Sequence, residues 1–344
     1  MAYGIWTTPV GPGPASPAEL FIDSDSTFPQ FKNRVSGNYN FNGGSRDFPI
    51  SGWDGSGQIV VVPTGSLCWQ WEVPPNLVPD VYVVNNISIV NNSTFRVSIN
   101  MNPGSNPLFD VAFNVYQIWP RANRNYGITF SNTADYFSIS DAGVVGQCIW
   151  AWEGNINGSM QIPAISGFDM SRASVFANWS GGQGLLYDAG SRNIRVYQNR
   201  TYDNGNNNQT GTINNVRVAV FCNGAGVPTH NGGLNIYSPN GSQCVFSTYR
   251  TPFMVDRFMA MSGGNTGLTY PMIPLTNGAG SIRGQAGSWY FQHARSHTMN
   301  GSSFGTGYGR YMFQWDRNYD MGGGGAISLQ IPVLDARKIF RSIQ

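Results

Sequence analysis

The sequence predicts an all-β protein built from tandem β-sandwich, jelly-roll-like modules with long polar loops and almost no helix. Many short runs rich in Val, Ile, Phe, Tyr and Trp are separated by Gly- and Asn-rich turns, a pattern typical of sandwiches and barrels. Only 11% of the residues are charged, against about 25% in an average protein. The Lys and Glu residues that normally cover helix surfaces are therefore scarce.

The expected strands follow one another along the whole chain. In the first half they are "QIVVV" from residue 58, "SLCWQWEV" from 66, "VYVVNNISIV" from 81, "FRVSIN" from 95, "FDVAFNVYQIW" from 109 and "GQCIWAWEGNI" from 146. In the second half they are "ASVFANW" from 173, "NIRVYQ" from 193, "NVRVAVFC" from 215, "SWYFQ" from 288, "GRYMFQW" from 309 and "ISLQIPVL" from 327. Strand side chains alternate, so Phe95, Val97 and Ile99 should share one face. Only "DARKIFRSIQ" at the C-terminus fits a short helix.

Length and strand spacing divide the chain into three expected modules: an N-terminal β module over 1–122, a middle one over 123–228 and a C-terminal one over 229–344. The stretch "YDNGNNNQTGTINN" from residue 202 predicts a hairpin tip with a long loop. That loop is a second place where a ligand or partner could bind, besides the C-terminal module.

Charge and hydropathy exclude several classes of function. The net charge is +2 and no run of Arg and Lys occurs, so we expect no nucleic-acid partner. No apolar run approaches the roughly 20 residues that span a bilayer, so we expect no membrane insertion. The opening "MAYGIWTTPVGPGPASPAEL" lacks the basic and apolar regions of a secretory signal. The 4 cysteines contain no C-x-x-C pair and are expected to be buried free thiols.

One motif occurs twice: "CWQWE" from residue 68 and "CIWAWE" from residue 148. Residues two apart on a strand share a face, which pairs Trp69 with Trp71, and Trp150 with Trp152. The favoured interpretation is core packing on equivalent inner strands of two related modules. Stacking of the tryptophans on sugar rings is the alternative, and a glycosidase pair of Glu72 and Glu153 is a weaker one.

Other motifs do not assemble a catalytic or metal site. "GSSFG" over 301–305 matches G-x-S-x-G, but a loop and a strand follow it instead of the required helix. His293 and His297 lack an evident third metal ligand, and they are expected to be hydrogen-bonded loop residues. Asp23 and Asp25 do not complete a calcium loop. We expect no catalytic residue, metal or cofactor.

Aromatic and basic residues gather near Gly-rich turns in the C-terminal module. Tyr, Trp and Arg give a large contact area for little loss of conformational entropy, which suits recognition of a glycan or a protein. Core packing is the competing interpretation. The candidate ligand or partner surface comprises Trp289, Tyr290, Arg295, Tyr308, Arg310, Tyr311 and Trp315.

Internal repetition links the N-terminus to two later segments. "YGIWTT…ELFIDSDSTFPQFKNRV" resembles "GGLNIYSPNGSQCVFSTYRTPFMVDRFM" from residue 232 and, more faintly, "YGITFSNTADYFSISDAGVVGQCIWAW" from 126. Each copy is expected to form a β-hairpin. "MAYGI" with "LFIDSDSTFPQF", and its echo "GLNIYSPNGSQCVFSTY", resemble small β-domain proteins of tailed-bacteriophage tail modules. The lysine-poor, Gly-, Asn- and aromatic-rich composition is similar to that of phage tail-tip and fibre proteins.

The resemblance implies a non-enzymatic virion structural protein of the tail, as a tip, baseplate or fibre component assembled in the host cytoplasm. The N-terminal module would attach to the tail. Expected partners are the chain itself, as a trimer or hexamer, and other phage tail proteins, with a bacterial surface glycan or protein receptor left open. Two alternatives remain: a carbohydrate-binding or glycan-hydrolysing β module, and a capsid or decoration jelly-roll protein.

Overall fold

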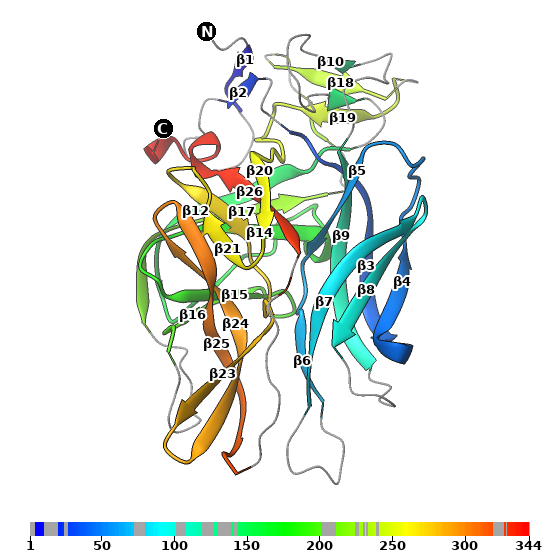
Figure 1. Ribbon diagram of the computed structural model, residues 1–344. Helices are drawn as coiled ribbons and strands as arrows, with labels where there is room; N and C mark the ends of the chain where they lie inside the picture. Colours follow the sequence, from blue (N-terminus) through cyan, green and yellow to red (C-terminus); the bar gives the residue numbers. More distant parts are fainter. Residues whose placement is uncertain are drawn as a thin grey trace.

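The computed structural model confirms the all-β fold (Figure 1). It describes residues 4–9, 20–23, 27–71, 80–100, 108–118, 127–128, 139–140, 144–200, 211–223, 227–229, 231, 233–238, 241–318, 327 and 329–343. Helical structure among these residues is limited to short 3₁₀ turns: η1 (Asn42–Gly44), η2 (Met170–Arg172), η3 (Ala336–Lys338) and η4 (Arg341–Ile343). The helix expected at the C-terminus is thus a pair of 3₁₀ turns, and Asp335 caps the first by accepting a hydrogen bond from the Arg337 amide.

The first β-sandwich lies within residues 30–118. One sheet has the order β3-β9-β5 and the other β4-β8-β7-β6. The strands are β3 (Gln30–Asn40), β4 (Ser45–Pro49), β5 (Gln58–Pro63), β6 (Cys68–Trp71), β7 (Asp80–Asn91), β8 (Thr94–Asn100) and β9 (Leu108–Ile118). The ring centroid of Phe113 on β9 lies 6.4 Å from that of Phe48 on β4 and 6.1 Å from that of Phe95 on β8. Aromatic side chains of the two sheets therefore fill the space between them.

The second β-sandwich lies within residues 147–335. One sheet has the order β12-β17-β14-β22-β26-β20, and the other has β13-β16-β15-β24-β25-β21 with β23 paired to β24. The strands are β12 (Gln147–Asn157), β13 (Ser159–Gln161), β14 (Ala173–Asn178), β15 (Gly184–Asp188), β16 (Asn193–Tyr197), β17 (Thr212–Cys222), β20 (Arg257–Ala260), β21 (Gly263–Asn265), β22 (Pro271–Pro274), β23 (Ser281–Ala286), β24 (Trp289–Asn300), β25 (Ser303–Asp316) and β26 (Gln330–Asp335). Val175 and Val218 of one sheet join Leu185 and Val196 of the other in one core.

The boundary expected between 123–228 and 229–344 does not separate two sets of sheets. Strand β14 pairs with β22, and β15 pairs with β24, so both segments contribute to both sheets of the second sandwich. The hairpin tip expected around residue 202 falls largely on residues outside the described part. The strands on either side of it, β16 and β17, belong to different sheets and do not pair with each other; residues 201–210 are not described.

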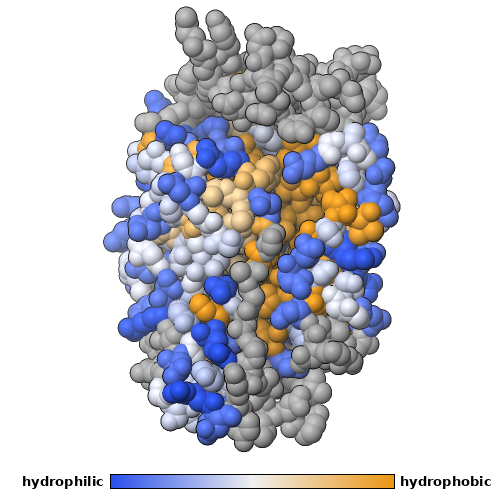
Figure 2. All heavy atoms as spheres, viewed as in Figure 1, coloured by the Kyte–Doolittle hydropathy of each residue, from blue (hydrophilic) through white to orange (hydrophobic). Residues whose placement is uncertain are grey.

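A second hydrophobic cluster joins the two sandwiches. On strand β9, the Val115 side chain points into the interior of the first sandwich, which belongs to the main core shared by the sandwich interiors. The neighbouring Tyr116 side chain points into this second cluster. The Tyr116 ring lies 5.3 Å from Phe253, which lies 5.5 Å from Phe176 on β14. Figure 2 shows hydrophobic residues gathered along the middle of the molecule, with hydrophilic residues on both sides. The sandwiches are thus packed face to face through apolar side chains.

Buried hydrogen bonds fix how the two sandwiches meet. Asn223 Nδ2 donates to the Tyr116 hydroxyl at 2.7 Å, and Asn114 Nδ2 donates to Ser174 Oγ at 3.0 Å. The Tyr116 and Ser174 hydroxyl oxygens lie 3.2 Å apart. Directional bonds between buried groups require one particular alignment, so this network sets the relative position of the sandwiches.

The hairpins predicted from the internal repeats are confirmed in all copies. They are β1 (Gly4–Thr7) with β2 (Leu20–Asp23), β10 (Gly127–Ile128) with β11 (Ile139–Ser140), and β18 (Asn235–Tyr237) with β19 (Cys244–Ser247). Figure 1 places these hairpins together at the end of the molecule that carries the N-terminus. The segments that follow them are joined by isolated bridges: Thr27 with Val255, Gln30 with Val145, and Gln147 with Pro252.

Candidate functional site

The first Trp-x-Trp-Glu copy closes the edge of a sandwich. Strand β6 is the edge strand of its sheet, so the expected inner position is wrong. Trp69 is half-buried and stacks on Phe109 of the opposite sheet at 4.7 Å between ring centroids. Its indole Nε1 donates to the Asp110 carbonyl at 3.2 Å. The predicted packing role is confirmed for Trp69; the Trp71 side chain and Glu72 lie outside the described part.

The second copy also lies on an edge strand, β12. Trp150 and Trp152 are half-buried and pack against the main core, as predicted. Glu153 pairs with Arg217 across the neighbouring strand β17, and their oxygen and nitrogen atoms lie 2.7 Å apart. A two-carboxylate glycosidase site remains untested, because Glu72 lies outside the described residues.

The C-terminal aromatic residues lie on the long β24–β25 hairpin. Trp289 is 43% exposed, whereas Trp315 is only 5% exposed. Tyr290 lies opposite Trp315, with ring centroids 5.5 Å apart, and the Arg283 guanidinium lies 4.5 Å from the Tyr290 ring centre. Trp315 also packs against Phe313. Part of the proposed surface is therefore a small aromatic core.

The other four members lie further along the same hairpin. Arg295 is half-buried, donating to the Ser281 carbonyl at 2.9 Å, and burial lowers its pKa. Tyr308 and Tyr311 are half-buried, and their rings form T-shaped contacts with the His293 ring, at 5.4 and 5.9 Å between ring centroids. Arg310 is exposed. Of the seven residues, only Trp289 and Arg310 are exposed enough to contact a partner with most of the side chain.

The histidines on this hairpin are buried inside β24, not placed in a loop as expected. His293 Nδ1 lies 3.2 Å from the Gly309 carbonyl, and His297 Nε2 lies 3.4 Å from Thr276 Oγ1. Burial lowers the pKa of both, to about 4 for His297. Residues Gly301 and Ser302 form the turn between β24 and β25, so the hydrolase-like motif is a hairpin turn followed by the first residues of a strand.

The four cysteines are buried and free, as predicted. Burial raises the pKa of Cys68 and of Cys148 to about 12. Among the described residues, no group of three or more His, Cys, Asp or Glu side chains lies close enough to hold a metal ion. No helix in the same part of the chain is long and apolar enough to cross a membrane.

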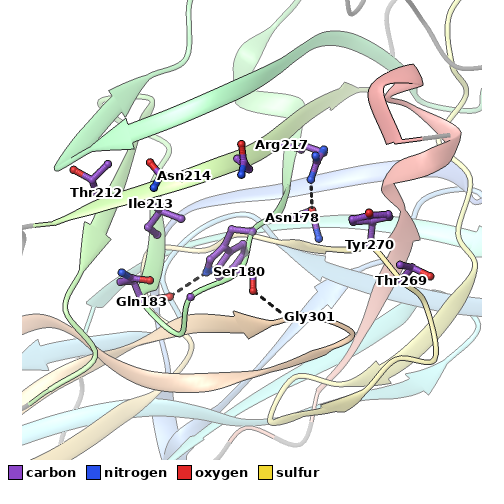
Figure 3. Close-up of a pocket in the computed structure, with 13 residues that line it drawn as sticks. Asn178, Ser180, Gln183, Thr212, Ile213, Asn214, Arg217, Thr269, Tyr270 and Gly301 are labelled. Carbon is purple, nitrogen blue, oxygen red and sulfur yellow. Dashed lines mark hydrogen bonds between the residues drawn. The ribbon is translucent and has the colours of Figure 1, made fainter.

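A cleft of about 630 Å³ opens in the second sandwich (Figure 3). Its walls come from separate segments: the β14–β15 turn, the start of β17, the residues before β22 and the β24–β25 turn. The residues that line it are Asn178, Trp179, Ser180, Gly181, Gln183, Thr212, Ile213, Asn214, Asn215, Arg217, Thr269, Tyr270 and Gly301. Side chains that carry amides and hydroxyls dominate this lining.

The β14–β15 turn shapes the floor of the cleft. Gly181 and Gly182 adopt φ angles of +128° and +77°, which side chains with a Cβ rarely reach. The buried Trp179 closes the turn by donating from its indole Nε1 to the Gln183 carbonyl at 3.0 Å. Ser180 lies against the β24–β25 turn, where its Oγ accepts from the Gly301 amide at 3.4 Å. The floor is therefore held in place by one hydrogen bond within the β14–β15 turn and one to the β24–β25 turn.

One ionised side chain, Arg217, lines the described part of the cleft, and its charge is balanced. It pairs with Glu153 at 2.7 Å and donates to Asn178 Oδ1 at 3.1 Å. Its guanidinium also lies 5.4 Å from the centre of the Tyr270 ring. Ser342 Oγ donates to the same Glu153 carboxylate. This part of the cleft therefore offers hydrogen bonds and an aromatic surface, with no pair of acid and base groups.

Sequence reasoning missed this cleft. Asn, Ser, Thr and Gly occur throughout the chain, so amide residues at a site do not stand out. Two local signals were available: the "SGGQ" turn after Trp179, and the lone arginine in the apolar strand "NVRVAVFC".

Comparison with curated proteins and with solved structures gave no significant match. A family profile, in contrast, matches residues 4–317, which include the first sandwich, the hairpins, the cleft and every strand of the second sandwich except β26. The chain therefore belongs to DUF6453, a family of unknown function.

Proposed function

We propose that the protein is a non-enzymatic structural component of a bacteriophage tail, at the tip, baseplate or fibre, and that it acts by binding other chains. The resemblance of the repeated segments to tail-module proteins supports this role. The observation that carries it is the gathering of the repeated hairpins at one end of the molecule (Figure 1).

These hairpins are incomplete as sheets. Within the described residues, each consists of two strands and none pairs with a third strand. A two-stranded sheet is only marginally stable in water, and its edges present amide and carbonyl groups for further pairing; on β19 the Val245 carbonyl already accepts from the Val145 amide at 3.0 Å. A strand from a neighbouring subunit would complete such a sheet by main-chain hydrogen bonds. The hairpin end therefore suits attachment to another copy of the chain or to another tail protein.

The composition supports the same role. Desolvating charged groups on association is costly, and 11% of the residues are charged. Amide and hydroxyl groups can exchange water for a partner with a smaller penalty. Tyr237 on β18 adds an aromatic ring that is 47% exposed, and exposed Tyr is common in binding surfaces.

Native mass and particle labelling test this proposal. We expect a trimer or hexamer by light scattering and native mass spectrometry, and antibody labelling of phage tails. Tyr237→Ser should shift the protein toward smaller species. Leu108→Ser is the control, because this hydrophobic side chain is similarly exposed, at 54%, at the start of β9 in the first sandwich, and it should leave the mass unchanged. A persistent wild-type monomer, or labelling of the capsid shell, would contradict the proposal.

A further inference from the structure

We infer that the cleft between the β14–β15 turn, the start of β17 and Tyr270 binds a neutral oligosaccharide. This inference concerns a site distant from the hairpins and does not rest on the assembly role. The volume of about 630 Å³ lies within the roughly 300–1,000 Å³ of small-molecule sites. Such sites are usually mostly apolar, whereas most residues of this lining carry an amide or hydroxyl side chain, which favours a ligand rich in hydroxyl groups.

The charge of the cleft favours a neutral ligand. Arg217 is its ionised lining residue within the described part, and Glu153 lies 2.7 Å away. An anionic ligand would have to compete with that carboxylate for the guanidinium. A cationic ligand would meet the guanidinium itself. A neutral ligand avoids both penalties and leaves the ion pair intact.

The polar groups match the chemistry of sugar hydroxyls. A hydroxyl group both donates and accepts hydrogen bonds, as an amide side chain does through its two ends. Gln183 Oε1 and Arg217 Nε have almost no accessible surface and no hydrogen-bond partner within the described structure, so the Gln183 side chain has to turn toward the cleft before its oxygen can accept from a ligand. Thr212 and Asn214 are exposed on the β17 wall. Together they offer polar contacts from two sides of the cleft (Figure 3).

Tyr270 supplies the apolar contact that sugar rings also need. Its ring is half-buried on the wall opposite Thr212 and Asn214 (Figure 3). An aromatic side chain with a polar end can cover the C–H face of a sugar and still bind its hydroxyls. An extended peptide would instead pair with the part of β17 that continues beyond its last partner on β14, Asn178 opposite Arg217, and peptide binding is therefore the competing outcome of the test.

Saturation-transfer NMR and calorimetry with neutral oligosaccharides test the inference. The probes are maltotriose, cellotriose, mannotriose and N,N′,N″-triacetylchitotriose, with a sialylated trisaccharide and a Ser/Asn-rich peptide as comparators. We expect at least one neutral sugar to bind, and neither comparator to bind more tightly. Gln183→Met removes an amide while keeping the side-chain length, and Asn214→Ala alters an exposed wall residue. Each should weaken binding by about 3- to 10-fold, the worth of one hydrogen bond.

The controls separate this site from the rest of the molecule. Asn86→Ala changes an exposed amide on β7 of the other sandwich and should leave sugar binding unchanged. All variants should keep the wild-type native mass, so loss of sugar binding is distinguishable from loss of assembly. The inference is overturned if none of the neutral sugars binds, if binding is insensitive to both cleft variants, or if the sialylated sugar or the peptide binds more tightly.

Discussion

Acidification should destabilise the protein through His297, a histidine buried in the second sandwich. The side chain is fully buried on β24, its Nε2 lies 3.4 Å from Thr276 Oγ1, and its Nδ1 has no hydrogen-bond partner in the described structure. Burial lowers its pKa from 6.5 to about 4. An imidazolium at this position would need a second acceptor that the surrounding side chains do not provide.

The direction and size of the effect follow from this pKa. Between about pH 6.5 and about pH 4, the unfolded chain binds a proton at His297 and the folded chain does not. The stability that neutral His297 contributes is therefore fully present above the pKa of the unfolded state, and it is lost as the pH falls toward the pKa of the folded state. Because each pKa unit corresponds to about 1.4 kcal/mol, the loss is about 2.5 kcal/mol at about pH 4.5.

Denaturant unfolding at about pH 7.5 and about pH 4.5 measures this loss. Carboxylates and His293 also titrate, so wild type must be compared with His297→Gln, which keeps a polar side chain near Thr276 but does not titrate. Groups shared by both proteins cancel in the comparison. Wild type should lose about 2.5 kcal/mol more free energy of unfolding than the variant over this pH range. Equal losses in the two proteins would refute the reasoning.

Three further perturbations test other parts of the fold. Lys338→Met leaves the buried Asp256 carboxylate without the ammonium 2.6 Å away and should cost about 1–3 kcal/mol at neutral pH. Burial already raises the Asp256 pKa, so the folded state binds a proton more readily and the deficit should shrink on acidification; an unchanged deficit in denaturant titrations would contradict this. Cys68 and Cys148, whose pKa burial raises to about 12, should react with Ellman's reagent only after unfolding, and rapid labelling of native protein would contradict their burial. Tyr116→Phe removes a hydroxyl that bonds a buried amide at 2.7 Å and should cost about 1–3 kcal/mol; unchanged thermal and denaturant stability would show that the network contributes little.

Strands with strong side-chain contrast could be predicted from the sequence. In β8, Phe95, Val97 and Ile99 are buried and alternate with polar residues, as expected. The run "QIVVV" in β5 has no alternation because both of its faces are covered. Val61 packs in the main core, and Val60 packs in the cluster between the sandwiches. A continuous apolar run is therefore the signature of a strand covered on both faces.

Strand β3 and the order of strands could not be predicted. The sequence "QFKNRVSGNYN" of β3 is mostly polar, and most of its side chains are half-buried or exposed. It forms a strand because β9 provides a long partner edge, with the register running from Gln30 opposite Gln117 to Asn40 opposite Leu108. Pairings such as β14 with β22 depend on packing between distant segments. The local sequence of a strand does not indicate which distant strand it will pair with.

The cleft escaped prediction for the same physical reason. Glu153 and Arg217 become partners only through the register of β12 and β17, and Tyr270 reaches them from a third segment. The aromatic C-terminal set stood out because Trp and Tyr are rare enough to be conspicuous. Conspicuous residues in this chain include buried ones such as Trp315, so aromatic density alone did not distinguish a surface from a core.

The repeated Trp-x-Trp-Glu sequence can be explained by the position of its strands. Each copy ends a sheet, where a strand has one neighbour and the sandwich is open to solvent on one side. A large ring directed inward covers that opening: Trp69 reaches the opposite sheet through Phe109 and the Asp110 carbonyl. Trp150 and Trp152 pack against the main core in the same way at the edge of the second sandwich. Closing an open edge is a shared physical requirement, so the two copies resemble each other without needing a shared ligand.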